Sequence, residues 1–108
     1  MEDKVRNLLG LAKKAGRLVL GTERVKRALE DKTVKLLIIA NDAGVHSRWE
    51  AGVLADRNSI PYVYLSNKVE LGLIFGQATI ALAGITDDNM VREIQRILAE
   101  GAKPMGSS

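Results

Sequence analysis

Residues 34–40 read VKLLIIA, and this stretch decides the fold. Beyond Lys35 it is a continuous apolar run of strand length, without the alternation expected of a strand that has one wet face. A strand that is apolar on both sides belongs at the centre of a sheet covered by helices on both faces. The sequence therefore predicts an α/β protein with this strand inside it.

Helix-like and strand-like segments alternate on both sides of this run. Apolar spacing and end signals predict helices at about 5–14, 22–29, 47–57, 67–75 and 87–98, and strands at 17–21, 34–40, 60–65 and 78–85. Such alternation predicts a single three-layer α/β/α sandwich with a four-stranded, mostly parallel (mixed) sheet. We expect one domain over residues 1–100 and a flexible tail over 101–108.

Four of these helices carry a polar residue where a cap is expected. Thr22, Ser47 paired with Glu50, Asn67, and Thr86 or Asp87 are the predicted helix starts. Gly76 is the predicted end of the fourth helix.

Composition excludes several classes of protein. The chain has 108 residues and no cysteine, so disulfides, thiolate metal sites and cysteine nucleophiles are excluded. Aromatic residues make up only 4% of the chain, which predicts an aliphatic core in which Trp49, Tyr62 and Tyr64 serve packing. No apolar run reaches the length of a membrane span, and residues 1–7 lack a signal peptide's apolar stretch. We expect a cytoplasmic, monomeric protein.

Charge is distributed unevenly along the chain. Residues 1–35 hold ten Lys and Arg against five acids, whereas the remainder holds six basic residues and eight acids. An anionic partner would therefore meet the first third of the chain.

The residues give little support for an enzyme. Asp42, His46 and Ser47 lie within six positions, but neighbours on one loop rarely form a nucleophile, base and orienter. Asp42 follows the buried strand, where a phosphate-accepting aspartate would lie, yet the first strand ends without the acid that a magnesium site would need. Asp42 as an organiser of its turn is the simpler interpretation. We expect no catalysis, no cofactor and no metal.

The stretch GTERVK at residues 21–26 is the sharpest candidate site. Glu23 and Lys26 lie three apart on a predicted helix, so a carboxylate and an ammonium point to the same side. They could form a surface ion pair, with Glu23 also favouring the helix N-terminus. From the spacing alone the ion pair is the simpler interpretation, although the same two groups could also contact nucleic-acid bases, since carboxylates accept from guanine N–H groups and ammonium groups donate to guanine acceptors.

The chain resembles the kink-turn RNA-binding ribosomal protein superfamily of the L-seven-Ae and L-thirty-e type, and is most similar to its small bacterial YlxQ and YbxF members. The resemblance rests on LLGLAKKAGRLVLGTERVKRAL, LLIIANDA, IPYVYL, ELG and FG in this order, over about residues 4–98. It implies an α/β/α sandwich and a non-catalytic, ribosome-associated protein that binds a kink-turn or similarly bent RNA as part of a ribonucleoprotein.

The resemblance also implies which residues meet the RNA. They are a turn and helix start, a second loop and nearby basic residues: Gly21, Thr22, Glu23, Lys26, Arg27, Lys35, Lys68, Gln77, Ala78 and Thr79. Thr22 stands where the family usually has asparagine, and Ala78 where many members have glutamate. The alternative is a protein-interaction or scaffold module on the same fold, without RNA affinity of its own.

Overall fold

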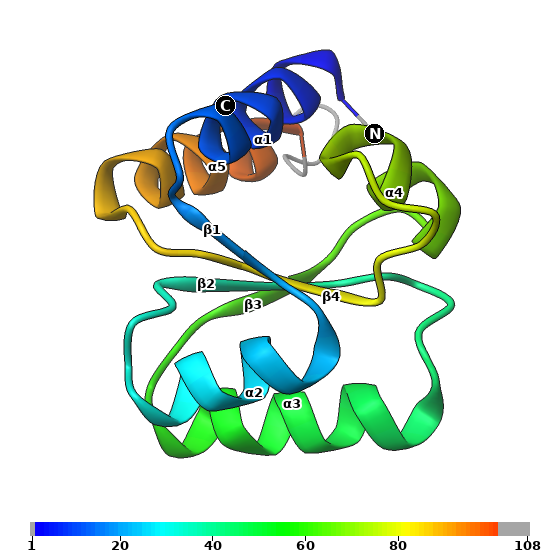
Figure 1. Ribbon diagram of the computed structural model, residues 1–108. Coiled ribbons are helices and arrows are strands. Elements are labelled where there is room, and N and C mark those ends of the chain that lie inside the picture. Colours follow the sequence, from blue (N-terminus) through cyan, green and yellow to red (C-terminus); the bar gives the residue numbers. More distant parts are fainter. Residues whose placement is uncertain (1, 102–108) are drawn as a thin grey trace.

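The computed structural model describes residues 2–101, and its elements alternate as predicted. They are α1 (Asp3–Lys14), β1 (Leu18–Leu20), α2 (Thr22–Glu30), β2 (Leu36–Ile39), α3 (Val45–Arg57), β3 (Tyr62–Tyr64), α4 (Lys68–Phe75), β4 (Leu82–Ile85) and α5 (Asp88–Gly101). Figure 1 shows the three layers: α1, α4 and α5 cover one face of the sheet, and α2 and α3 cover the other. The predicted sandwich is confirmed. The tail expected at the C-terminus lies, for residues 102–108, outside the described part.

The sheet has the strand order β1-β4-β2-β3. Three strands run in the same direction, but β4 lies between β1 and β2 and is antiparallel to both, so that only β2 and β3 form a parallel pair. The predicted mixed sheet is confirmed. The insertion of β4 between two earlier strands was not predicted, because an alternating helix–strand pattern does not specify the position or direction of each strand.

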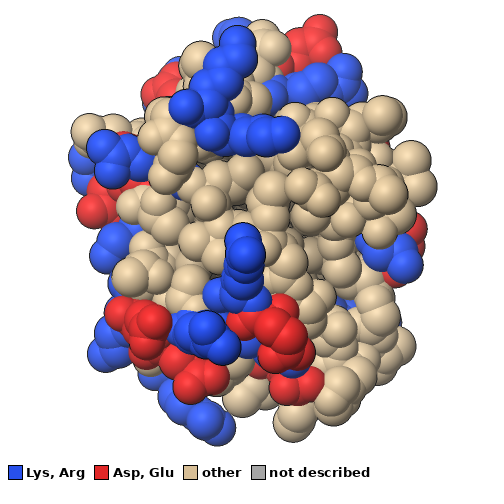
Figure 2. Space-filling view, in the orientation of Figure 1, with Lys and Arg blue, Asp and Glu red and all other residues tan. Residues whose placement is uncertain are grey.

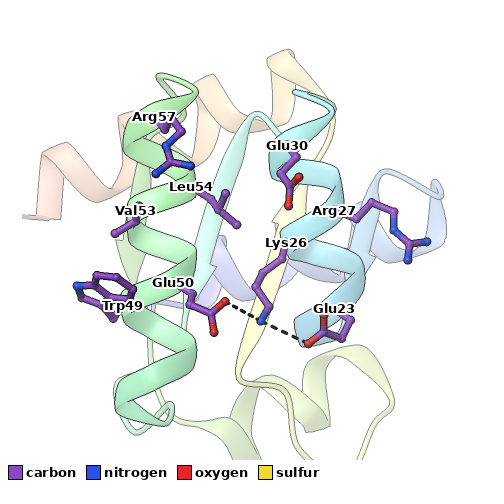
Figure 3. A pocket seen from close by; sticks show the side chains of 9 residues that line it. All are labelled: Glu23, Lys26, Arg27, Glu30, Trp49, Glu50, Val53, Leu54 and Arg57. Atoms are coloured by element: carbon purple, nitrogen blue, oxygen red, sulfur yellow. Dashed lines mark hydrogen bonds and ion pairs between the residues drawn. The ribbon is translucent and has the colours of Figure 1, made fainter.

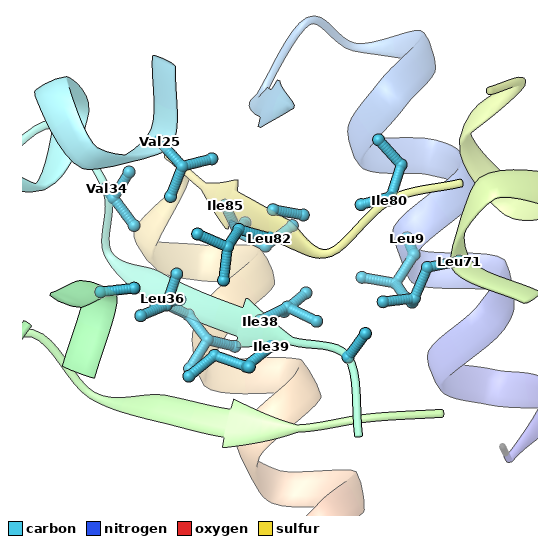
Figure 4. Close-up of a cluster of buried hydrophobic side chains, with 14 of the residues drawn as sticks. Leu9, Val25, Val34, Leu36, Ile38, Ile39, Leu71, Ile80, Leu82 and Ile85 are labelled. Carbon is cyan, nitrogen blue, oxygen red and sulfur yellow. The ribbon is translucent and has the colours of Figure 1, made fainter. Parts of the chain in front are cut away.

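The core forms around β2, as its apolar run predicts. All four residues of β2 are fully buried, and those of β4 are buried beside them. Figure 4 shows aliphatic side chains from the sheet meeting Val25 of α2 and, on the other side, Leu9 of α1 and Leu71 of α4. Each such side chain contributes about 1.5–3 kcal/mol by leaving water. This burial holds the two central strands, β2 and β4, in place.

Two of the predicted helix caps are wrong and two are confirmed. Gly21 and Gly44 precede α2 and α3 without any side-chain cap, so neither Thr22 nor Ser47 caps a helix. Asn67 accepts a hydrogen bond from the Glu70 amide (2.8 Å), and Asp87 accepts one from the Met90 amide (2.9 Å). Helix α3 begins at Val45, two residues before the predicted start, which leaves Glu50 free for another role.

Candidate nucleic-acid interface

Two distant segments of the chain meet at one end of the sheet. Leu20, the last residue of β1, lies opposite Ala83 of β4, and Ile39, the last residue of β2, lies opposite Leu82. The turn into α2 and the loop that precedes β4 therefore emerge side by side. This arrangement brings the predicted residues 21–26 and 77–79 together at one end of the strands, which we call the edge at Gly21.

Gly21 gives α2 its entry angle. Its φ of +101° is a backbone conformation that residues with a Cβ rarely adopt. The amide of Val25 donates to the Gly21 carbonyl (2.9 Å), which closes the first turn of the helix. The N-cap position makes no side-chain hydrogen bond to the amides of the first turn, and the N-terminus of a helix is a position where an anion is favoured.

Lys26 connects the two outer helices α2 and α3. Its Nζ lies 3.3 Å from Glu23 Oε1 on α2 and 3.3 Å from Glu50 Oε2 on α3, as Figure 3 shows. The Lys26 side chain is only 15% exposed, whereas that of Glu23 is 85% exposed. The expected pair of carboxylate and ammonium is therefore present, with Glu23 outermost and Lys26 held between two acids.

The electrostatic surroundings keep Lys26 charged. Partial burial lowers the pKa of Lys26, but the hydrogen bonds and attraction from Glu50 and Glu23 outweigh this effect and raise the pKa overall. An ammonium offers three N–H donors. Two of them are directed to carboxylates, so one is left for a ligand.

Glu50 is a residue that sequence reasoning missed. Its Oε1 also lies 2.5 Å from Nε2 of His46, one turn earlier in α3, so Glu50 connects Lys26 to the start of that helix. The spacing of Ser47 and Glu50 indicated a capping box instead, and nothing local in the sequence relates Glu50 to residue 26.

The loop at Gln77, Ala78 and Thr79 is exposed, and its backbone lies close to helix α4. A Cβ placed on Gly72 of α4 would lie 2.5 Å from the Gln77 carbonyl oxygen and 2.7 Å from that of Ala78. The loop backbone therefore packs directly on α4, and the position tolerates glycine alone. Lys13 of α1 donates from Nζ to the Phe75 carbonyl just before the loop, so this lysine supports the loop as well as adding positive charge.

Lys68 lies at the same end of the sheet. Its amide donates to Asp42 Oδ1 (2.8 Å), and its carbonyl accepts from the Ile80 amide (3.0 Å). Asp42 thus joins the loop after β2 to the start of α4, which extends its expected role as a turn organiser. Both hydrogen bonds leave the Lys68 side chain available at the edge.

Two predicted residues lie apart from this edge. The amide of Lys35 donates to the Ile85 carbonyl (2.7 Å) at the other end of the sheet, so Lys35 is not brought together with residues 21–26. Arg27 lies one turn beyond Glu23, is exposed, and points away from Lys26 in Figure 3. Gly21, Thr22, Glu23, Lys26, Lys68 and residues 77–79 remain as the clustered set.

The surface around α2 is mixed in charge. Figure 2 shows basic and acidic side chains interleaved over the lower part of the molecule, where α2 lies, and mostly uncharged residues on the side of α4. A groove of about 520 Å³ runs between α2 and α3 and is lined by charged side chains together with Trp49, Val53 and Leu54. Such a surface favours specific polar contacts over general attraction to phosphate.

The three aromatic residues assigned to packing are exposed instead. Trp49 is 65% exposed, and Tyr62 and Tyr64 are 39% and 47% exposed. The prediction failed because Trp49 lies on the outer side of α3 and the tyrosines belong to a strand at the sheet edge.

Among residues 2–101, no cluster of His, Cys, Asp or Glu has the arrangement of a metal site. Within the same range, no helix has the length and hydropathy needed to cross a membrane.

The fold is an α/β/α sandwich with a mixed four-stranded sheet. Residues 3–94 match the Ribosomal protein L7Ae/L30e/S12e/Gadd45 family, and the chain belongs to that family. It is 31% identical over 88 residues to the large ribosomal subunit protein eL8 of Picrophilus torridus, covering 81% of this chain and 69% of that protein. It is 24% identical over 95 residues to the RNA-binding protein YlxQ of Enterococcus faecium, covering 88% and 91%.

Solved structures share the fold. A Bacillus halodurans protein described as having unknown function superposes with a TM-score of 0.85 at 30% identity, covering 91% of this chain and 99% of that one. A Giardia lamblia 15.5kD RNA binding protein superposes with a TM-score of 0.77 at 18% identity, covering 93% and 89%. The second likeness concerns the fold alone.

Proposed function

We propose that the protein is a non-catalytic, cytoplasmic RNA-binding protein that recognises a kink-turn or similarly bent RNA in a ribosome-associated particle. Its membership of the ribosomal family supports this role. So do its relatives, of which one is a ribosomal protein and another is named as RNA-binding.

The observation that carries the proposal is the pairing of Glu23 with Lys26 beside the loop at residues 77–79. A kink-turn exposes guanine edges of sheared G·A pairs in a widened groove. Glu23 is exposed and can accept from guanine N–H groups, while the remaining donor of Lys26 can reach a guanine acceptor. The open amides of the α2 start would meet phosphate.

Two departures from the family pattern predict a lower affinity for the RNA. Thr22 has a short hydroxyl where an asparagine would offer a longer amide with a carbonyl oxygen and two N–H donors. Ala78 has no polar side-chain group in the second loop. Both positions are exposed or half-buried at the edge, so neither change disturbs the remainder of the site.

The proposal is tested by comparing affinities for a kink-turn RNA and for a straight duplex of equal length. Lys26→Ala and Glu23→Ala should each weaken binding to the kink-turn by about 1–3 kcal/mol, the value of a good base contact, and hardly affect the duplex. Arg92→Ala on α5 is a control remote from the edge. Equal losses on both RNAs would contradict base recognition and would show that these residues act only through nonspecific electrostatic attraction.

A protein-interaction module remains the second candidate. The exposed Trp49, Tyr62 and Tyr64 favour it, because exposed aromatic residues are typical of protein interfaces. If the protein showed no preference for the kink-turn, the protein-interaction module would become the favoured function.

A further inference from the structure

The edge strand β3 presents an unpaired backbone. The Pro61 carbonyl accepts from the Leu37 amide and the Leu65 amide donates to the Ile39 carbonyl, each at 3.0 Å, so these alternate residues face β2. The backbone groups of Tyr62 and Tyr64 therefore point away from the sheet. No strand of the described residues lies beyond β3. No lysine or other charged residue lies in this strand to discourage pairing.

An aromatic groove follows this edge. It has a volume of about 380 Å³ and lies between β3 and one side of α3, where Val45, Trp49, Tyr62 and Tyr64 line it. The two tyrosine rings meet edge to face with centroids 6.4 Å apart. Exposed tyrosine and tryptophan at a free sheet edge are the residues that most often anchor protein interfaces.

The groove carries a basic and an acidic side chain, so its charges are complementary to those of the same groove on a second copy. Arg48 and Asp56 both line it, and neither takes part in a side-chain hydrogen bond or ion pair within residues 2–101. They lie eight residues apart on α3, about 12 Å along the helix, and Gly52 lies midway between them. A two-fold axis at that level would set Arg48 of each copy opposite Asp56 of the other.

We propose that this face binds a second copy of the chain, through antiparallel pairing of β3 with its symmetry mate. In that register Tyr62 of one copy lies opposite Tyr64 of the other. The outward amides and carbonyls of both residues then form reciprocal hydrogen bonds. The tyrosines pair across the strands, Trp49 loses exposure, and Arg48 meets Asp56 twice.

The proposal replaces the expectation of a monomer and does not rest on RNA binding. Because β3 has only three residues, the dimer is expected to be of roughly micromolar affinity, typical of a small interface. The dimer would hold two copies of the edge at Gly21 on opposite ends of one continuous sheet.

Sedimentation equilibrium from low micromolar to millimolar protein tests the pairing, with the emission of Trp49, the only tryptophan in the chain, as a second readout. Arg48→Asp and Asp56→Arg should each shift the protein to monomer. An equimolar mixture of these two variants should form a one-to-one heterodimer, because each of the two contacts then joins an acid to a base, one with reversed and one with native polarity. The double variant should again form a homodimer, and Arg92→Asp should leave association unchanged.

Three results would overturn the proposal. The first is a monomer up to millimolar concentration. The second is a dimer that both single variants retain, which would place the interface elsewhere. The third is a monomer whose Trp49 emission is quenched by a single-stranded RNA or shifted by an extended peptide, which would assign the groove to that ligand.

Discussion

At the scale of single residues, the site depends on one ammonium group shared between two helices. Lys26 pairs with Glu23 on α2 and Glu50 on α3, both at 3.3 Å. The ion-pair interpretation and the RNA-reading interpretation of Glu23 and Lys26 are therefore compatible. In the proposed function, the pair orients Lys26 before RNA binds, and the exposed Glu23 exchanges its partner for a base edge.

The pH dependence of stability should reveal this shared ammonium. Since the pKa of Lys26 is raised, its stabilising effect is fully present below the ordinary lysine pKa of 10.5 and is lost as the pH rises through the raised value. We expect the difference in unfolding free energy between the wild type and Lys26→Met to stay constant from neutral pH to about pH 9 and to shrink above 10.5. Urea unfolding across this range measures it, and a difference that shrinks below about pH 9 would contradict the assignment.

Gly21 offers a second test at this scale, with Gly44 as a matched control. Both glycines precede a helix without a side-chain cap, but only Gly21 has a positive φ, since the φ of Gly44 is −56°. Gly21→Ala should destabilise the protein by about 1–3 kcal/mol and weaken RNA binding. Gly44→Ala should cost distinctly less, because its backbone is not strained and its Cβ would meet no atom within 4 Å. Equal effects on the melting curves would show that the backbone at Gly21 is not the cause.

At the scale of the elements, the sequence predicts most of what carries the site. Apolar spacing and end signals locate the nine elements of residues 2–101, because burial of one face of a helix or of a whole strand leaves such patterns in the sequence. Helix starts are less predictable: a capping residue such as Asn67 is identified by its own chemistry, whereas Gly21 and Gly44 begin helices without any side-chain signal. The pairing of Glu50 with Lys26 depends on how α2 and α3 pack, which no local pattern reports.

The support of the loop by α4 gives a prediction at this scale. Gly72→Ala would place a methyl group against the backbone of Gln77 and Ala78, so the loop must move. We expect a loss of about 1–3 kcal/mol in unfolding free energy, typical of overpacking, and weaker RNA binding. Gly10→Ala in α1 is the control, because its Cβ would meet nothing within 4 Å and alanine favours a helix by up to about 1 kcal/mol. An unchanged melting temperature for Gly72→Ala would show that the contact is loose.

At the scale of the whole molecule, the topology decides which predicted residues act together. Antiparallel insertion of β4 carries residues 77–79 to the end of the sheet where α2 begins. The same topology leaves Lys35 at the opposite end. The sequence does not predict this separation, because strand order depends on packing between segments far apart in the chain.

Lys68 and Lys35 should therefore differ in their effect on RNA binding. Lys68→Ala should reduce the salt dependence of affinity by about one unit of slope, as expected for one lost phosphate contact. Lys35→Ala should leave both the affinity and the slope unchanged. Filter binding over a range of salt concentrations measures both variants, and a matching loss for Lys35→Ala would mean that the RNA covers the other end of the sheet.

The most direct measurement of the central claim is the shape of the RNA when it is bound. A kink-turn RNA labelled with a donor and an acceptor at its two ends, in moderate salt without magnesium, should gain energy transfer as the protein is added. Lys26→Ala should abolish that gain at the same protein concentration, while a straight duplex shows none with either protein. Binding that leaves the ends apart, or bending that Lys26→Ala fully retains, would contradict recognition through the edge at Gly21, Glu23 and Lys26.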